Sequence, residues 1–472
     1  MASRKTQPAR GMRDFLPEDV RRREYVIGVI KEVYERYGFE PLETPAVENI
    51  ETLMGKYGEE GNQLIFKILK RGVHESTGEA DLALRYDLTV PLARVVAEYR
   101  DKLPKFFKRY QIQPVWRADR PARGRFREFY QCDVDVLGSK SMVVEAEICA
   151  AASEVLTALD FTDFTIRLNH RQVLTGLLKK FGIAHDKESE ALVAIDKREK
   201  TGDAGVFKEL MLRGVPKDAA FKTQAFFTRT SKLNEDYQDV VGALGSEARE
   251  KIVTSVNEQV NGALLSQLKE DLSEDEVVQK GLTELESIIN LTKANGSAPR
   301  IRIDPGLARG LSYYTGAIME ISVAGIGSLG GGGRYDNLVG MFLGQDVPAC
   351  GFSLGLERII VVMTERGMFP LNLMSSPADV MVTIWNEDSI DESIALAHDL
   401  RSAGLRVDLY PEADKVSKQF KYASSRGIRF VLVLGDDERA RGEVAIKDMG
   451  SGEQRSLRRW EVAPVIRDWR LD

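Results

Sequence analysis

Cysteine and histidine are both scarce in this chain of 472 residues. Three cysteines (Cys132, Cys149 and Cys350) and four histidines occur. No two of the cysteines have the close spacing that structural zinc sites use. We therefore expect no zinc-type metal site, and cysteines that stay reduced inside the cell.

Long apolar runs are also missing. The N-terminal stretch MASRKTQPARGMRDFLP contains no hydrophobic segment of signal-peptide length. No later window approaches the ~20 apolar residues of a membrane-spanning helix. The sequence therefore predicts a cytoplasmic protein with no membrane partner.

An overall positive charge is absent too, because 66 basic and 72 acidic residues give a net charge of −6. A polyanionic partner must then be met by a local basic patch, since the field of the whole molecule repels it. Nine basic residues against two acidic ones lie between Lys102 and Glu128. They are Lys102, Lys105, Lys108, Arg109, Arg117, Arg120, Arg123, Arg125 and Arg127.

The order of sequence patterns predicts an α+β protein of about three domains. Strand and loop signals fill residues 38–138, with helical patterns at Pro17 to Tyr37 before them and Val143 to Leu159 after them. Helical periodicity then runs through residues 170–298, and strand signals return from Arg300. We expect an antiparallel-sheet core in two parts, 1–169 and 299–370, interrupted by a helical insertion of residues 170–298.

The last segment, residues 378–472, alternates apolar strands with helices. The order is VMVTIW, ESIALAHDLRSAG, LRVDLY, VSKQFKYASSRG and FVLVLG. Such alternation predicts a small α/β domain with a parallel or mixed sheet.

The most informative stretch runs from Lys108 to Gly138. With a period of two, one row holds Arg125, Arg127, Phe129, Gln131, Asp133 and Asp135, and the other holds Phe126, Tyr130, Cys132, Val134 and Val136. A loop at Asp119 to Gly124 can turn this strand back as a hairpin, which leaves Arg117 near Arg125. Clustered arginines suit a triphosphate. A charged, solvated edge strand is the alternative, and Phe129 and Gln131 in the polar row favour a binding site.

This stretch resembles motif 2 of class II aminoacyl-tRNA synthetases, in the form found in histidyl-tRNA synthetases. Four more segments are similar to that family, and they occur in its order. They are GFEPLETPAVE (motif 1, Gly38 to Glu48), LRYDLTVPLAR (Leu84 to Arg94) and LARGLSYYTG (Leu307 to Gly316), both of the histidine pocket, and PACGFSLGLERII (motif 3, Pro348 to Ile360). The C-terminal segment is similar to the family's anticodon-binding domain.

The resemblance implies a reaction with ATP, Mg²⁺, L-histidine and tRNA(His), and assigns residues to ATP. Arg117 is expected to hold the α-phosphate and the histidine carboxylate, and Phe129 to stack on the adenine. Asp119 and Arg125 match loop positions that meet ATP, and Arg358 matches the arginine that grips the γ-phosphate near a helix start. Arg309 is implied to bridge the carboxylate and the α-phosphate, so Arg117 and Arg309 are the expected catalytic pair.

The same resemblance assigns the histidine pocket. Asp87 and Thr89 are implied to face the ammonium group, Gln131 to lie close to the substrate, and Asp135 with Tyr314 to bracket the imidazole ring. Tyr313 and Tyr335 complete the set, with Arg117 and Arg309 at the carboxylate. Ser312 departs from the family, which commonly has an acidic residue there. For a bare tyrosine pair, ordinary core packing is the alternative role.

The glycine-rich run GSLGGGGRYD, Gly327 to Asp336, lacks the Walker lysine and the GxGxxG spacing of phosphate loops. The resemblance implies that it lets backbone pass close to the substrate. A flexible connection between strands is the alternative.

RNA contacts are expected at two places. Arg120 and Arg123, in the hairpin loop, are predicted to meet the acceptor end of tRNA, because they lie beside the ATP loop without being needed by ATP. Lys418, Gln419 and Lys421 are predicted anticodon contacts in the last domain. No DNA partner is expected. Motif 1 with the helix before it predicts a homodimer.

Two other functions fit parts of the pattern. A non-catalytic paralogue, like the regulatory subunit of ATP phosphoribosyltransferase, would share the core, but such proteins typically lack the anticodon-binding domain and motif arginines that are present here. A class II synthetase for proline, threonine or glycine would share the last domain, and the two histidine segments argue against it.

Overall fold

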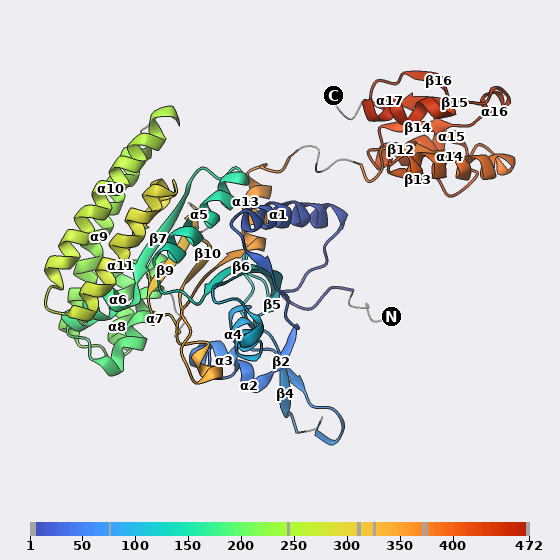
Figure 1. The fold of residues 1–472 in the computed structure, drawn as a ribbon. Coiled ribbons are helices and arrows are strands. Elements are labelled where there is room, and N and C mark those ends of the chain that lie inside the picture. Colours follow the sequence, from blue (N-terminus) through green and yellow to red (C-terminus); the bar gives the residue numbers. More distant parts are fainter. Residues whose placement is uncertain are drawn as a thin grey trace. The chain divides into compact units, whose positions relative to one another are not determined.

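The chain forms two compact units, Met1–Phe369 and Pro370–Asp472. The computed structural model describes residues 6–74, 77–242, 246–308, 313–323, 327–370, 373 and 376–468. The first unit contains an eight-stranded and a three-stranded sheet, and the second contains a five-stranded sheet (Figure 1). Each unit is therefore described by itself.

An eight-stranded sheet organises the first unit in the order β1-β5-β6-β11-β10-β9-β7-β8. Its strands are β1 (Glu40–Pro41), β5 (Phe107–Trp116), β6 (Glu128–Leu137), β7 (Phe164–His170), β8 (Ile301–Ile303), β9 (Ala317–Val323), β10 (Gly327–Arg334) and β11 (Ala349–Gly355). Neighbouring strands are antiparallel except for the two edge pairs, β1 with β5 and β7 with β8. The expected antiparallel core is confirmed.

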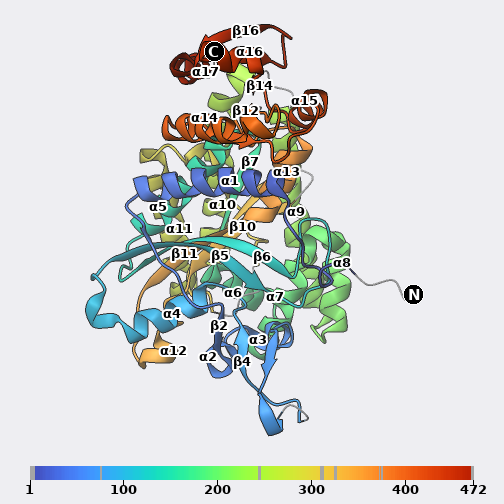
Figure 2. The same cartoon turned by 90° about the vertical axis from the view of Figure 1, so that its right-hand side faces the viewer.

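The alternation of β6 gives the sheet one apolar and one polar face. Cys132 and Val134 are fully buried in the hydrophobic core, and the hydroxyl of Tyr34 in α1 (Pro17–Arg36) donates to the Cys132 carbonyl at 3.4 Å. Figure 2 shows α1 on one side of the sheet and α4 with β2 and β4 on the other. The odd residues of β6 consequently face away from α1.

Helices and a small second sheet surround the large sheet in the first unit. The helices are α2 (Ile50–Leu53), α3 (Gly58–Gln63), α4 (Thr89–Glu98), α5 (Val143–Ala158), α12 (Gly340–Leu343) and α13 (Leu356–Glu365). The small sheet has the order β2-β4-β3, with β2 (Val47–Asn49), β3 (Lys67–Leu69) and β4 (Ala80–Leu84).

Helix α4 lies in a region where the sequence predicted mostly strands and loops, so that prediction was too simple. Its residues TVPLARVVAE are rich in β-branched side chains and include Pro91, which together favour extended structure. The helix forms because Pro91 lies in its first turn, where no amide is lost to the hydrogen-bond ladder. The carboxylate of Asp87 also accepts from the Val90 amide at 3.0 Å.

The insertion is helical, as expected. Its helices are α6 (Arg171–Lys180), α7 (Glu188–Asp196), α8 (Arg198–Leu212), α9 (Lys217–Gly242), α10 (Ser246–Asp271) and α11 (Glu276–Ala294). They share one hydrophobic core with the large sheet. The Asn261 side chain of α10 also bonds the edge strand β8, donating to the Ile301 carbonyl at 3.1 Å and accepting from the Ile303 amide at 2.9 Å.

The second unit has the predicted α/β alternation and a mixed sheet in the order β13-β12-β14-β15-β16. Its strands are β12 (Val380–Val382), β13 (Val407–Leu409), β14 (Phe430–Val433), β15 (Glu443–Asp448) and β16 (Gln454–Arg458). Its helices are α14 (Ile390–Ser402), α15 (Val416–Ser425), α16 (Asp436–Arg441) and α17 (Val462–Asp468). Strand β12 pairs in parallel with β13 and β14, and the remaining pairs are antiparallel.

In the described part of the chain, no helix combines the length and the apolar character needed to span a bilayer.

Candidate active site

A cavity of about 690 Å³ opens on the polar face of the large sheet. Every described residue that was predicted to bind ATP or histidine lines it. These are Asp87, Thr89, Arg117, Asp119, Arg125, Phe129, Gln131, Asp135, Tyr313, Tyr314, Tyr335 and Arg358. Arg309 and Ser312 lie outside the described residues. One concave site therefore collects side chains from segments spread over almost the whole first unit.

At the cavity floor, one buried arginine faces two buried carboxylates. Nη2 of Arg109 lies 2.8 Å from Oδ2 of Asp135 and 3.9 Å from Oδ2 of Asp133. The hydroxyl of Tyr335 donates to Oδ1 of Asp135. Burial raises the pKa of both carboxyls, that of Asp133 to about 7, while the Arg109 charge opposes the shift. The group carries one cation against two potential anions, so it attracts a cation or a hydrogen-bond donor.

Gln131 offers a second acceptor on the same strand. Its Nε2 donates to Oγ of Ser353 at 2.9 Å, which fixes the orientation of the amide. Among the described residues, its Oε1 is buried without a hydrogen-bond partner. A buried, unpaired carbonyl oxygen is costly unless a ligand donates to it.

The start of α4 supplies an anionic end to the cavity. Oδ1 of Asp87 accepts from the Tyr57 hydroxyl and from the Val90 amide, both at 3.0 Å. Burial raises the pKa of Asp87, and these hydrogen bonds and the charge of Arg117 partly oppose the rise. Thr89 begins the helix beside it. Asp87 is thus held in place to receive a cationic ligand group.

The arginines lie along the hairpin and the start of α13. Nε of Arg117 donates to the Tyr86 carbonyl at 3.0 Å, and its guanidinium lies 4.3 Å from the Tyr86 ring centre and 5.2 Å from that of Phe129. Arg358, in the first turn of α13, donates to the Ser328 carbonyl. Together with Arg125 they give this part of the cavity the positive charge that a triphosphate requires.

Glycines let strands approach the floor of the cavity closely. A Cβ on Gly351 would lie 1.8 Å from Oδ1 of Asp135, and one on Gly332 would lie 2.0 Å from the Gly351 carbonyl oxygen. The run Gly327 to Arg334 is strand β10, paired on both sides. The alternative of a flexible connection was therefore wrong, since the glycines are needed where strands and side chains have no room for a Cβ.

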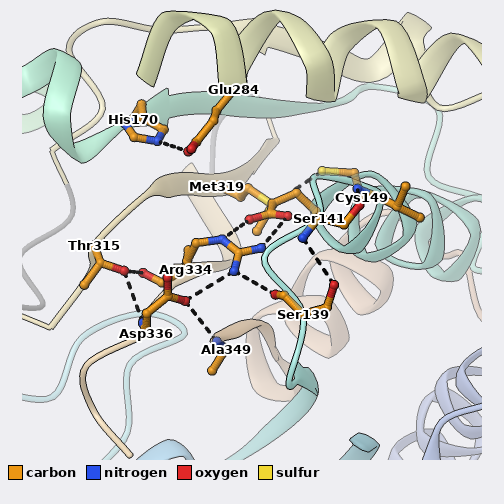
Figure 3. A network of polar contacts seen from close by, with 12 residues as sticks. Ser139, Ser141, Cys149, His170, Glu284, Thr315, Met319, Arg334, Asp336 and Ala349 are labelled. Atoms are coloured by element: carbon orange, nitrogen blue, oxygen red, sulfur yellow. Dashed lines mark hydrogen bonds and ion pairs between the residues drawn. The ribbon is translucent and has the colours of Figure 1, made fainter. Parts of the chain in front are cut away.

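A buried ion-pair network supports the end of β10, next to Tyr335 (Figure 3). Nε and Nη2 of Arg334 contact the two carboxylate oxygens of Glu145 in α5 at 2.6 and 2.9 Å. Nη1 of Arg334 donates to the Ser139 carbonyl at 3.0 Å and to Oδ1 of Asp336 at 3.2 Å. Because Arg334 and Glu145 are almost fully buried, this fork fixes the backbone that presents the Tyr335 ring.

The predicted RNA contacts lie elsewhere. Arg120 and Arg123 are exposed on the hairpin loop, and Arg123 forms an ion pair with Glu365, Nε to Oε1 at 3.0 Å. Lys418 and Lys421 are exposed on α15. Gln419 is fully buried, and its amide donates to the carbonyls of Ile384 and Asp414, both at 2.7 Å. A direct contact of Gln419 with RNA would require those bonds to open.

Two expectations about individual residues were wrong. Arg109 was counted in a basic surface patch, but its side chain is fully buried against the Asp133 and Asp135 pair. Phe126 was expected in the row of Val134 and Val136, opposite the polar row, but it lines the cavity. It precedes β6, so the alternation of that strand does not extend to it.

Sequence reasoning also missed Tyr57, Ser353 and Glu320, which line the cavity. From the insertion, Asp196 and Lys200 reach it as well. Ser353 lies opposite Asp133 in the neighbouring strand β11, and the sequence alone carries no signal for that pairing. Tyr57 carries no such signal either, since only the packing of a loop brings it to Asp87.

Comparison with known proteins identifies the family. A model of histidyl-tRNA synthetases matches residues 11–359, and one of an anticodon-binding domain matches residues 379–469. The histidine–tRNA ligase of Gloeobacter violaceus is 41% identical, covering 95% of each chain, and that of Flavobacterium johnsoniae is 38% identical, covering 97% of this chain and 98% of its own. The crystal structure of histidyl-tRNA synthetase from Nostoc sp. PCC 7120 has a TM-score of 0.75 at 34% identity, covering 98% of this chain and 99% of that chain. The chain belongs to the histidyl-tRNA synthetase family.

Proposed function

We propose that the cavity on the large sheet is where this chain, a histidine–tRNA ligase, activates L-histidine with ATP and then transfers it to tRNA(His). The observation that carries the proposal is the convergence of the motif 2, motif 3 and histidine-pocket residues on one cavity. The reaction belongs to the family; the roles of the single residues below are our assignment.

The first step joins the histidine carboxylate to the α-phosphorus of ATP. A carboxylate oxygen attacks in line, the bond to the β-phosphate breaks, and pyrophosphate leaves. No proton has to be removed from a carboxylate at neutral pH, so the reaction requires positioning and stabilisation of negative charge. In our assignment Arg117 and Arg309 stabilise this negative charge, Arg358 holds the γ-phosphate, and Asp119 and Arg125 meet ATP from the hairpin loop.

In the second step a ribose hydroxyl at the 3′ end of tRNA attacks the carbonyl carbon of the adenylate. The ester forms, and AMP leaves as the anhydride bond breaks. We propose no covalent intermediate on the enzyme.

The acidic floor of the cavity explains selection of histidine. The Asp135 carboxylate, held by Arg109 and Tyr335, and Oε1 of Gln131, which has no hydrogen-bond partner among the described residues, are two acceptors that an imidazole N–H can reach. Asp87 accepts the ammonium group, and the rings of Tyr313 and Tyr314, 5.2 Å apart, form the wall. A site built from buried polar groups rejects analogues that lack their partners by ~10⁴ or more.

Mg²⁺ enters with ATP in this proposal. In nucleotide sites the ion is held by phosphates together with one or two carboxylates. Within the described part of the chain, no group of three or more His, Cys, Asp and Glu side chains could hold a metal by itself. We therefore propose that the nucleotide brings the ion into the cavity.

The compartment that we propose for the protein is the cytoplasm.

We also propose a homodimer that pairs through the small sheet. Val47, in the motif 1 segment, is 37% exposed, and Leu82 is 36% exposed. Val47 pairs with Leu84, so Val47 and Leu82 lie on the same face of the sheet. Leu69, on the neighbouring strand, is 54% exposed. Such an apolar surface favours contact with a second copy.

In our assignment, residues 1–169 and 299–370 carry out the chemistry, and residues 170–298 form a helical insertion between them. Residues 378–472 bind the anticodon. Arg120 and Arg123 are proposed for the acceptor end, and Lys418, Gln419 and Lys421 for the anticodon. Replacing both arginines with alanine should leave activation intact and weaken charging. Unchanged tRNA binding and charging would show that Arg120 and Arg123 do not contact the RNA.

The function is tested by amino-acid-dependent exchange of labelled pyrophosphate into ATP, with each of the twenty amino acids offered separately. We expect exchange with histidine only. Exchange with a different amino acid would overturn the pocket assignment, and no exchange with any would overturn the catalytic proposal.

A further inference from the structure

The N-terminal segment of residues 11–16, here called the strap, packs directly on the hairpin loop between β5 and β6. The Arg127 amide donates to the Gly11 carbonyl at 2.8 Å. Gly11 has a φ of +84°, and a Cβ there would lie 2.8 Å from Cγ of Arg127 and 2.9 Å from Cγ of Pro121. The close approach and the left-handed conformation both require glycine at this position.

A column of alternating aromatic rings and guanidinium groups begins at Phe126, beside the strap, and ends at Tyr130 in β6. The Arg13 guanidinium carbon lies 3.4 Å from the ring centre of Phe126 and 4.9 Å from that of Phe15. Beyond Phe15, the guanidinium carbon of Arg23 lies 4.1 Å from the Phe15 ring and 4.7 Å from the Tyr130 ring. All four separations are within the range of cation–π attraction.

The far end of the column is anchored in the catalytic core. Oε1 of Glu357 accepts from Nη1 of Arg23 at 2.8 Å, and its Oε2 accepts from the Tyr130 amide at 3.0 Å. Arg23 and Glu357 are 8% and 3% exposed. Glu357 precedes Arg358 in α13, so the column is tied to the start of the helix that carries the proposed γ-phosphate ligand.

The near end of the column lies at the cavity. Phe126 lines it, next to Arg125 in sequence. Nε of Arg127, the residue on the other side, donates to the carbonyl of Asp119 at 3.1 Å. Asp119 and Arg125 belong to the same loop, and they are the loop residues assigned to ATP. Whatever fixes Phe126 therefore also restricts the loop that carries them.

We propose that Arg13 is a positioning residue for ATP, which acts by stacking on Phe126 and thereby holds the hairpin loop in its nucleotide-binding conformation. This inference rests on the proposed function, because it requires Asp119 and Arg125 to contact ATP. Arg13 itself does not line the cavity, and its effect on ATP is indirect. It has no role in the histidine pocket, which is built on β6, α4 and the segment around Tyr313.

The test is histidine-dependent pyrophosphate exchange with the full-length Arg13→Ala variant. Arg13 is exposed, and a cation–π contact at an exposed site contributes ~0.5–1 kcal/mol, which at ~1.4 kcal/mol per tenfold predicts that KM for ATP rises roughly two- to fivefold. KM for histidine and kcat should stay within twofold. Arg13→Lys keeps the charge but loses the planar face, so it should recover only part of the loss. Arg10→Ala, which removes an exposed arginine directly before the strap, is the matched control and should change nothing.

Two further variants keep the outcomes distinct. Arg125→Ala tests the ATP assignment itself: if it leaves KM for ATP unchanged, the proposed function of the loop fails. If Arg125→Ala raises KM for ATP while Arg13→Ala leaves it unchanged, or lowers only kcat, the positioning role is overturned. Should Arg13→Ala not fold, Phe15→Leu removes the central ring of the column outside the cavity. It must then raise KM for ATP selectively, and an unchanged KM would overturn the inference.

Discussion

Burial makes the two carboxyl groups on the cavity floor less acidic than exposed aspartates. Asp133 and Asp135 share the single charge of Arg109, and neither is more than 2% exposed. Burial and mutual repulsion raise the pKa of Asp133 from 3.8 to about 7. The free site thus retains a proton at a pH where exposed aspartates have lost theirs.

Asp133→Asn should change the dependence of stability on pH. The folded Asp133 has the higher pKa, so the folded state holds an extra proton between pH 3.8 and about 7. The free energy of unfolding therefore falls as pH rises through this window, by at most ~1.4 kcal/mol per pH unit. The asparagine variant lacks this fall. Its Tm relative to the original chain should rise from pH 5 to pH 8, and a constant difference would contradict the raised pKa.

Glu145→Gln should destabilise the first unit strongly. The substitution leaves Arg334 buried opposite a neutral amide, and breaking a buried ion pair costs ~3–5 kcal/mol. Glu147→Gln on the same helix is the matched control, because Glu147 is 43% exposed in its pair with Lys108, and such pairs contribute ~1 kcal/mol or less. Urea unfolding measures both, and equal effects would show that the Arg334 network does not stabilise the fold.

Strands β6, β10 and β11 show how elements create a site that single residues could not. The polar row of β6 was predictable, because a period of two is visible in the sequence and survives in the structure. The strands that pair with β6 were harder to predict from the sequence. Which strand lies beside β6, and so which side chains face Gln131 and Asp135, follows from a pairing between segments more than 200 residues apart.

Gly351→Ala should damage the histidine pocket. The added methyl would overlap Oδ1 of Asp135 at 1.8 Å, and either the carboxylate or the strand must move, at ~1–3 kcal/mol. KM for histidine in pyrophosphate exchange should rise at least tenfold, with KM for ATP less affected. Gly355→Ala, on the same strand, meets only the Leu329 carbonyl oxygen at 3.3 Å and should have a smaller effect. Equal effects of the two variants would contradict the proposed role of Gly351.

Element types were predicted well where periodicity was strong, as in α1, α5, β6 and the second unit. Helix α4 was missed, because an aspartate before it and a proline in its first turn override the extended preference of its residues. Tyr57 and Arg109 were misjudged for a related reason. Their roles come from tertiary packing, which the sequence of a single segment does not predict.

At the scale of the whole molecule, the first unit holds the proposed chemistry, and the second matches the anticodon-binding domain. The insertion shares its core with the large sheet, and Asp196 and Lys200 bring it to the cavity. The insertion and the site are therefore parts of one body, and changes in the insertion can affect activation.

Assembly is tested at this scale with Leu82→Lys. The substitution places a charge on the apolar face of the small sheet. If two copies pair through this face, the charge is buried away from water, which is unfavourable. Light scattering at micromolar concentration should give a dimer for the original chain and a monomer for the variant. Lys70→Glu on the same hairpin, where Lys70 lies 3.6 Å from Glu79 at the surface, controls for charge alone. A monomeric original chain would refute the dimer.

The most direct test of the proposed site is a crystal structure of the full chain with histidine and a non-hydrolysable ATP analogue. We predict the imidazole between Asp135 and Tyr314, the carboxylate and α-phosphate at Arg117, and the adenine on Phe129. A nucleotide bound away from Arg117 and Phe129, or an imidazole away from Asp135, would contradict the site described here.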